Sequence, residues 1–424
     1  MVKMLRTRLS LMVFLEYAVW GSYMISIGMF LSSIGLGSRI GLFFAAQGIA
    51  ALFMPALCGI IADRLVQPQR LYGLCHLLSA AFMGLMAFEC SLPGAGFARI
   101  FIPYCLGILF FIPTISLTNS ICFTLLGRQG MDPAQVFPGI RMWGTVGFIC
   151  AMWAVNFLGI QASYMQFVLR TVLGIVLAAY ALLLPACTLM HESAGRSAGE
   201  LMGIGAFKLF RSRDMAVFFL FAMAFGICLH ISNGYAGPYM ESFAVEPRFS
   251  ASPLVRNSML VLSVSQISEA LCTLLIPVCL KRLGVRKVFM VAALAWTVRY
   301  VLLAFGNPAG RAWMLVIAMV MYGLAFDFFN IAASIYVDRN TEGRAKSSGQ
   351  GLLLMMTNGF GASVGMLAMQ YVMNLFTGPE MVGGRFYTLG NWQGAWLAFA
   401  GFTFAVFVLL ALFFKEKNVM NDGK

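Results

Sequence analysis

The chain has 424 residues, of which 60% are hydrophobic and only 11% are charged, and its mean hydropathy is +0.85. A soluble protein built around one or two cores does not carry so large an apolar fraction, so the composition places the chain in a lipid bilayer. The formal net charge of +13 comes from basic residues that alternate with apolar stretches. It therefore reflects topology and anionic lipid, and we expect no nucleic-acid partner.

Apolar segments long enough to cross roughly 30 Å of hydrocarbon as helices recur along the whole chain. We count twelve, which predicts an all-α polytopic membrane protein. The first contains Glu16 and is too long for a signal peptide, so we interpret it as an uncleaved helix. The expected spans are 9–34, 39–62, 71–92, 98–125, 139–160, 164–188, 215–243, 254–280, 286–306, 311–337, 347–376 and 391–414.

The longest polar break, at 189–214, leaves six expected spans on either side. We therefore predict two pseudo-symmetric six-helix bundles, at 1–190 and 215–424, joined by a central cytoplasmic loop at 191–214. With both termini in the cytoplasm, 20 Lys and Arg residues lie on the cytoplasmic side and 6 on the opposite side. This bias agrees with the positive-inside rule and fixes the expected orientation.

A short loop motif follows the second expected span. Gly59, Asp63 and Arg64 form a Gly-x-x-x-Asp-Arg sequence, and a second basic turn, at 281–287, occupies the matching place in the other half. The motif resembles the signature loop of the major facilitator superfamily, which implies two halves that rock about a site near the membrane midplane. We expect these three residues to form a conformational latch. A solvated loop that only follows the charge rule is the alternative.

Arg141, Glu269 and Asp327 lie within the apolar spans. A charged side chain at mid-bilayer costs roughly 2.5–3.5 kcal/mol on insertion scales, and such groups mark substrate or ion pathways. Snorkelling of Arg141 to the membrane surface is the alternative for that residue.

Polar and aromatic side chains share helix faces with these charges. Arg141, Thr145 and Phe148 are spaced to lie on one face, and three other spans carry similar groupings. Amides and carboxylates match sugar hydroxyls and heterocycle edges, whereas rings offer stacking faces, so we expect a small, polar, partly aromatic ligand. The candidate binding residues are Arg141, Thr145, Phe148, His230, Asn233, Gln266, Glu269, Tyr322, Phe326 and Asp327.

Five long stretches make the resemblance more specific. Residues 48–64, 137–153, 263–272, 321–337 and 351–361 are similar to segments of the bacterial nucleoside:proton symporter family. The resemblance covers nearly the whole chain. It implies a central nucleoside site at the candidate residues and inward, proton-coupled nucleoside uptake by alternating access across the bacterial inner membrane.

Two residues depart from the family pattern. His230 stands where family members carry a glutamine, which bears on base preference, and Glu16 stands where a neutral amide is expected. Asp327, Glu269 and Glu16 are the candidate proton carriers.

Other functions are weighed against this one. A carrier for a modified nucleoside or a sugar, or an uncoupled nucleoside facilitator, would share the same topology. An enzyme is disfavoured because the three histidines lie in separate segments and no H-E-x-x-H motif occurs. The ten cysteines form no C-x-x-C pair, so we expect neither a metal nor a cofactor. The expected partners are a nucleoside, a proton and the lipid bilayer, and we expect the protein to function as a monomer.

Overall fold

The computed structural model describes residues 2–187, 204–341 and 345–414. Nine helices within these ranges are long and apolar enough to cross a membrane. Large apolar side chains such as Leu274, 73% exposed, and Leu375, 66% exposed, cover their outer faces, as lipid contact requires. The protein is therefore a mostly helical, multi-pass chain, whereas the expected count of twelve spans stays a prediction.

The first part of the chain forms seven α-helices and one short 3₁₀ helix. Their bounds are α1 Val2–Gly21, α2 Ile27–Ser33, η1 Gly37–Arg39, α3 Ile40–Arg64, α4 Pro68–Ser91, α5 Phe97–Arg128, α6 Pro133–Phe157 and α7 Met165–Ala181.

The first expected span, 9–34, is broken between α1 and α2. In the break, Ser22 donates to the carbonyl oxygen of Val19 at 2.9 Å, and Ser26 donates to Gln166 Oε1 at 2.7 Å, with Tyr23 O as a more distant alternative acceptor at 3.4 Å. Serine hydroxyls compete in this way with the helical pattern. The break explains why this span is absent from the nine long helices.

The second part of the chain is also helical, with one β-hairpin before the last helix. Its elements are η3 Ile204–Arg211, α9 Arg213–Ser242, η4 Phe243–Val245, α10 Pro247–Ser250, α11 Pro253–Arg256, α12 Ser258–Phe305, α13 Ala312–Asn340, α14 Ala345–Leu354, the π-helix η5 Met355–Gly365, α15 Met366–Phe376, β1 Thr377–Val382, β2 Arg385–Gly390 and α16 Trp392–Phe413.

Helix α12 contains two of the expected spans, 254–280 and 286–306. They are divided at Gly284, whose φ of +75° and ψ of +169° are not helical. Glycine adopts this conformation without the steric cost that a Cβ would add. The basic turn at 281–287 therefore lies at a sharp bend between two helices, as its sequence indicates.

The hairpin β1–β2 was not among the expected elements. Its strands pair antiparallel from Thr377 opposite Gly390 to Val382 opposite Arg385, and Gly383 and Gly384 form the turn. Both glycines have positive φ, +59° and +80°, which is the geometry that a two-residue hairpin turn of this hand requires.

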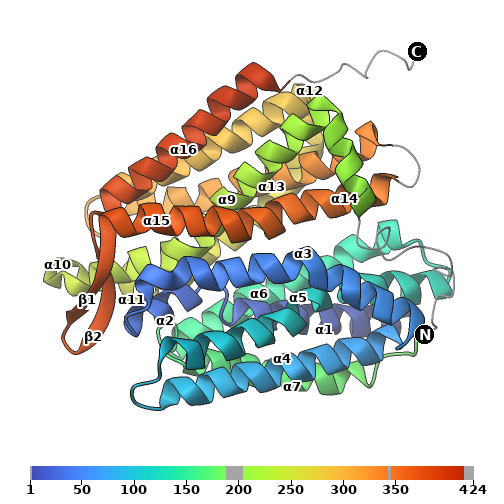
Figure 1. Cartoon of the computed structure of the whole chain (residues 1–424), viewed down its shortest axis with the longest axis horizontal. Coiled ribbons are helices and arrows are strands. Elements are labelled where there is room, and N and C mark those ends of the chain that lie inside the picture. The colour runs from blue at the N-terminus through green and yellow to red at the C-terminus, as the bar shows by residue number, and fades with distance from the viewer. Residues whose placement is uncertain (1, 188–203, 342–344, 415–424) are drawn as a thin grey trace.

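Figure 1 shows the helices α1–α7 and the helices α9–α16 as two groups, one below and one above. The hairpin, at the left of the figure, belongs to the upper group but contacts the lower one. The hydroxyls of Ser32 and Thr388 lie 2.7 Å apart, and the ring of Phe386 packs on Gly35. The junction at 188–203 lies outside the described residues, so the bounds of the predicted bundles and central loop stay predictions.

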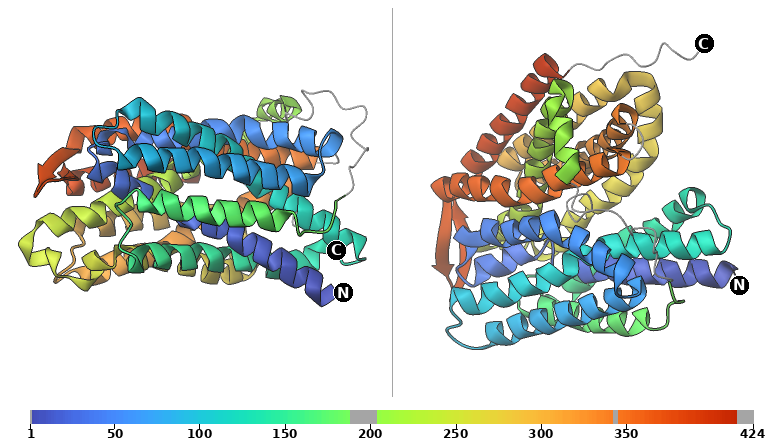
Figure 2. Two further views of the ribbon diagram at one scale, coloured as in Figure 1. Left: turned by 90° about the horizontal axis from the view of Figure 1, so that it is seen from below. Right: turned by 45° about the vertical axis from the view of Figure 1, so that its right-hand side comes forward.

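Further hydrogen bonds join the two groups. They run from Gly41 N to Gln370 Oε1 at 2.6 Å, Asn374 Nδ2 to Ser38 O at 3.2 Å, Trp153 Nε1 to Ser263 Oγ at 2.9 Å and Asn156 Nδ2 to Asn257 Oδ1 at 3.0 Å. Figure 2 (right) shows the two groups meeting at the hairpin end and diverging toward the end where α1 begins.

Candidate functional site

Charged side chains from three helices converge between the two groups. Arg141 on α6 interacts electrostatically with Glu269 on α12 and with Asp327 on α13, and the two carboxylates also interact with each other. Asp327 is 4% exposed, and its Oδ2 accepts a hydrogen bond from Thr273 at 2.5 Å. A cation from the first helix group therefore faces two carboxylates from the second. Each of these charges therefore has an opposite charge nearby, which offsets part of the cost of burying it.

Arg141 is held in place by an aromatic ring and a glycine. Its guanidinium lies over the ring of Tyr17 on α1, 4.0 Å from the centroid, in a cation–π contact. A Cβ at Gly144 would lie 2.7 Å from the Tyr17 ring and 2.9 Å from Arg141 Nη1. Only a residue without a side chain fits there. Arg141 therefore points between the two helix groups and does not snorkel to the surface.

The predicted aromatic residue of α6 lies against a further ring of α1. Phe148 is buried and meets Trp20 edge-on, with the centroids 6.1 Å apart, while Thr145 is half-buried one turn earlier. Tyr17 and Trp20 are three residues apart on α1, next to Glu16, and this spacing could have identified both as candidate site residues. They extend the predicted face of α6 onto α1.

On the other side, Tyr322 is fixed by a buried cation. The Arg299 guanidinium lies 5.1 Å from the Tyr322 ring centroid, donates to Ser232 Oγ at 2.8 Å and also donates to Ala318 O. Tyr322 packs on Phe326 at 5.7 Å. The half-buried Gln266 lies beside the Tyr322 hydroxyl. Arg299 was not among the candidate residues, and it positions the aromatic side of the site.

His230 and Asn233 come from α9 and lie where this helix meets the first group. The His230 ring is 6% exposed and meets Phe44 of α3 edge-on at 6.1 Å. Within the described part of the chain, neither ring nitrogen has a hydrogen-bond partner. Asn233 is half-buried. An unpaired buried imidazole is costly unless something else bonds to it.

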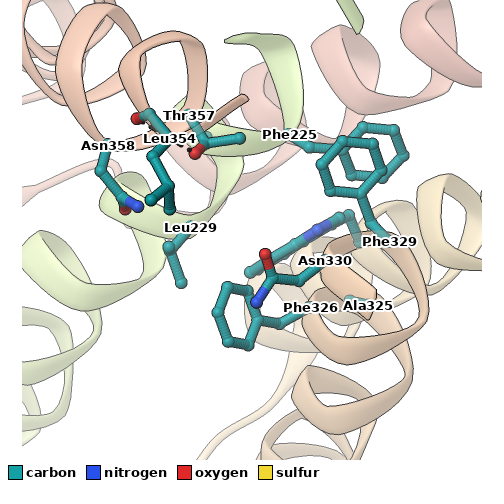
Figure 3. A pocket seen from close by; sticks show the side chains of 11 residues that line it. Phe225, Leu229, Ala325, Phe326, Phe329, Asn330, Leu354, Thr357 and Asn358 are labelled. Atoms are coloured by element: carbon teal, nitrogen blue, oxygen red, sulfur yellow. Dashed lines mark hydrogen bonds between the residues drawn. The ribbon is translucent and has the colours of Figure 1, made fainter. Parts of the chain in front are cut away.

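A small cavity opens beside Phe326. Figure 3 shows Asn330 and Phe326 of α13 on one side and Asn358, Thr357 and Leu354 on the other. Its volume is about 70 Å³. Ligand pockets measure roughly 300–1,000 Å³, so in this state the cavity is too small for a nucleoside. Of the ten candidate binding residues, only Phe326 lines it.

Glu16 lies elsewhere, inside the first helix group. It is 1% exposed and accepts hydrogen bonds from Tyr72, His76 and Thr114. The side chains of Asp63 and Arg64 lie outside the described residues, and a Cβ at Gly59 would meet no atom within 4 Å. The conformational latch therefore stays a prediction.

Comparison with known proteins gives a consistent result. The sequence profile of the family described as nucleoside H+ symporter matches residues 3–419. The nucleoside permease NupG of Escherichia coli (strain K12) is 37% identical over 419 residues, which are 98% of this chain and 97% of that protein. The xanthosine permease of the same organism is 38% identical over 413 residues, 97% and 95% of the two chains.

Solved structures agree with the sequence relatives. A crystal structure of the nucleoside transporter NupG superposes with a TM-score of 0.87 at 35% identity, covering 97% of this chain and all of that one (100%). A peptide transporter of the POT family has a TM-score of 0.68 at 13% identity, covering 96% and 95%, and shows a likeness of fold alone. The family and its relatives are transporters, not enzymes.

Proposed function

Since the chain belongs to the nucleoside H+ symporter family, we propose that it carries nucleosides inward across the bacterial inner membrane together with protons, by alternating access. The observation that supports this best is that Arg141 lies within electrostatic range of Glu269 and Asp327 between the two helix groups. In a carrier whose two halves rock around a central site, both halves contribute residues to that site. Here both helix groups contribute charged side chains.

The proposed architecture is twelve spans in two six-helix bundles, with both termini in the cytoplasm. Helix α12 supplies two of the spans, and α1 with α2 supplies the first. In this orientation the hairpin lies outside the cell, and its contacts with Ser32 and Gly35 close the outer end. The described conformation is then inward-facing, and the protein works as a monomer.

The proposed substrate site joins the ten candidate residues. Asp327 and Glu269 accept hydrogen bonds from ribose hydroxyls, Arg141 donates to the substrate, and the rings of Phe148, Tyr322 and Phe326 stack on the base. Thr145, Asn233 and Gln266 supply further hydrogen bonds, and the free nitrogens of His230 face the base. The small volume beside Phe326 implies that the halves move to admit and enclose a nucleoside.

Proton coupling requires that proton and nucleoside each bind one conformation more tightly than the other. Asp327, Glu269 and Glu16 are the candidate carboxylates. Asp327 and Glu16 are buried, whereas Glu269 is half-buried. The proposed latch at Gly59, Asp63 and Arg64 holds one conformation closed at the cytoplasmic end.

The test is uptake of labelled uridine or adenosine into transport-deficient cells that express the chain. We expect accumulation that stops when a protonophore collapses the proton gradient. Uptake that ignores the gradient would make the protein an uncoupled facilitator. Competition by a sugar but not by nucleosides would assign it another solute. His230→Gln, tested over a series of competing nucleosides, reports base preference, and we expect the rank order of purines and pyrimidines to change.

A further inference from the structure

A carboxylate and an imidazole are buried together inside the first helix group, away from the residues proposed to bind nucleoside. Glu16 Oε2 lies 2.7 Å from His76 Nε2, and each side chain is 1% exposed. The Tyr72 hydroxyl donates to the same oxygen at 2.7 Å. The pair joins α1 to α4. A carboxylate so far from water needs either a fixed countercharge or a proton.

The third partner of Glu16 can serve both of its protonation states. Thr114 Oγ1 lies 2.7 Å from Glu16 Oε1 and 2.6 Å from the carbonyl oxygen of Phe111. A hydroxyl has one proton to donate and can also accept. It donates to Glu16 when the carboxylate is ionised. When Oε1 carries a proton, Thr114 accepts from it and donates to Phe111. In both protonation states of Glu16, every hydroxyl proton at this position therefore has an acceptor.

The imidazole cannot take the extra proton so easily. His76 Nδ1 is buried and has no hydrogen-bond partner among the described residues. With Nε2–H donating to Glu16, a second proton on Nδ1 would be a buried donor without an acceptor, which costs roughly 1–3 kcal/mol. The pair therefore takes its proton on Glu16, and His76 acts as a fixed donor.

Other ionisable groups surround the Glu16–His76 pair, and they come from α1, α4, α6 and α7. Arg170 of α7 is fully buried, donates to Ser79 Oγ at 2.7 Å and interacts electrostatically with Glu16. The remaining titratable groups that face the pair are Tyr72 and Cys75 of α4, and Tyr17 and Tyr23 of α1, with Arg141 of α6 beyond Tyr17.

We propose that Glu16, held by His76, Tyr72 and Thr114, is a second proton-binding site that carries one proton inward with each nucleoside, separate from Glu269 and Asp327. The proton binds Glu16 from the outer water in another conformation and leaves to the cytoplasm. Tyr17, the next residue, holds the Arg141 guanidinium, which links this site to the substrate site. The inference rests on the proposed function.

The test is the reversal potential of nucleoside flux in proteoliposomes that contain the purified full chain, because this potential gives the number of protons per nucleoside. Glu16→Gln keeps the size and hydrogen-bonding capacity of the side chain but cannot carry the proton. We expect it to bind nucleoside within about threefold of the parent, a shift below 0.7 kcal/mol, and to move one proton fewer. An unchanged stoichiometry would overturn the proposal.

A second variant covers the case in which Glu16→Gln does not fold. Thr114→Val removes the donor to the ionised carboxylate and the acceptor for the protonated one, and it leaves the acid in place. Because the bond to the ionised form is the stronger of the two, we expect an unchanged stoichiometry with the alkaline limb of the uptake profile moved to higher pH. An unmoved profile would contradict the site. Gln47→Leu, which removes a buried hydrogen bond to Tyr104 in the same helix group, is the matched control and should shift neither quantity. If the parent itself moves no nucleoside, the proposed function fails instead.

Discussion

Each charged side chain buried in this protein has a specific set of partners. Asp327 has Thr273, and Arg299 has a hydroxyl, a carbonyl oxygen and the Tyr322 ring. Arg170 is held in the same manner by both oxygens of Ser79 and the rings of Tyr23 and Phe111. Of the arginines Arg141, Arg170 and Arg299, Arg141 alone interacts with carboxylates of the opposite helix group. Arg170 and Arg299 therefore stabilise the packing within one helix group, whereas Arg141 is the cation proposed to bind substrate.

Removing either carboxylate of the central site should weaken transport strongly. A hydrogen bond to a charged group contributes about 1.5–3 kcal/mol, which is roughly a 10- to 100-fold change. We expect Asp327→Asn and Glu269→Gln each to lose that much uptake at normal expression. Thr273→Val, which removes only the Asp327 donor, should cost less. Full uptake by both carboxylate variants would remove them from the site.

Gly144 offers a steric test of the Arg141 position. Gly144→Ala would force apart Tyr17 and Arg141, and overpacking of this kind costs roughly 1–3 kcal/mol. We expect weaker nucleoside binding by isothermal titration. Gly139→Ala, on the same helix with no atom within 4 Å of its added Cβ, is the matched control and should bind like the parent. Equal binding by both variants would show that the contact is not needed.

At the scale of elements, the hairpin β1–β2 is one of the parts of the second helix group that contact the first. Its own attachment is firm, because Arg385 pairs with Glu241 of α9 at 2.9 Å and Trp392 Nε1 donates to Thr388 O at 3.1 Å. The contact with α2 is weaker and depends on Ser32 and Thr388. An element that is fixed to one group and lightly bonded to the other can release when the groups separate.

A disulfide across this contact should stop the transport cycle. We expect the Ser32→Cys, Thr388→Cys double variant to lose uptake on mild oxidation and to recover it on reduction, because the outer end can no longer open. Each single variant is a control that should respond to neither treatment. Uptake that continues with the disulfide formed would mean that the hairpin stays closed throughout the cycle.

The whole molecule was the easiest level to predict from the sequence, and single contacts were the hardest. Twenty-residue apolar runs indicate spans because length and hydropathy are local properties. The break at Ser22–Ser26 and the bend at Gly284 already altered that pattern, since each depends on one or two residues. The hairpin escaped prediction because its strands are only six residues each and separate two apolar helices.

The candidate site shows the same limit. Buried charges in apolar spans stand out, so Arg141, Glu269 and Asp327 could be found from the sequence. Thr273 lies one turn after Glu269 on the same face and carried a usable signal. Arg299 did not, because its partners Ser232 and Ala318 come from two other helices and only the fold brings them together.

The inward-facing assignment predicts from which side the central cavity can be reached. Asn358 lines the cavity beside Phe326 and is half-buried. In a background with the exposed Cys150 changed to serine, we expect Asn358→Cys to react with an impermeant thiol reagent in inside-out vesicles and much less in right-side-out ones. Added nucleoside should slow the reaction. Faster labelling from the outer face would reverse the assigned orientation.

The bonds that join the two helix groups at the hairpin end are made by hydroxyls, amides, backbone groups and an indole, and the described residues there include no ion pair between the groups. Dissolved salt screens charges but leaves neutral hydrogen bonds nearly untouched. The strength of these contacts at the hairpin end should therefore vary little with the ionic strength of the medium. In a bacterium that meets both fresh and saline water, these contacts between the two helix groups would therefore keep a similar strength.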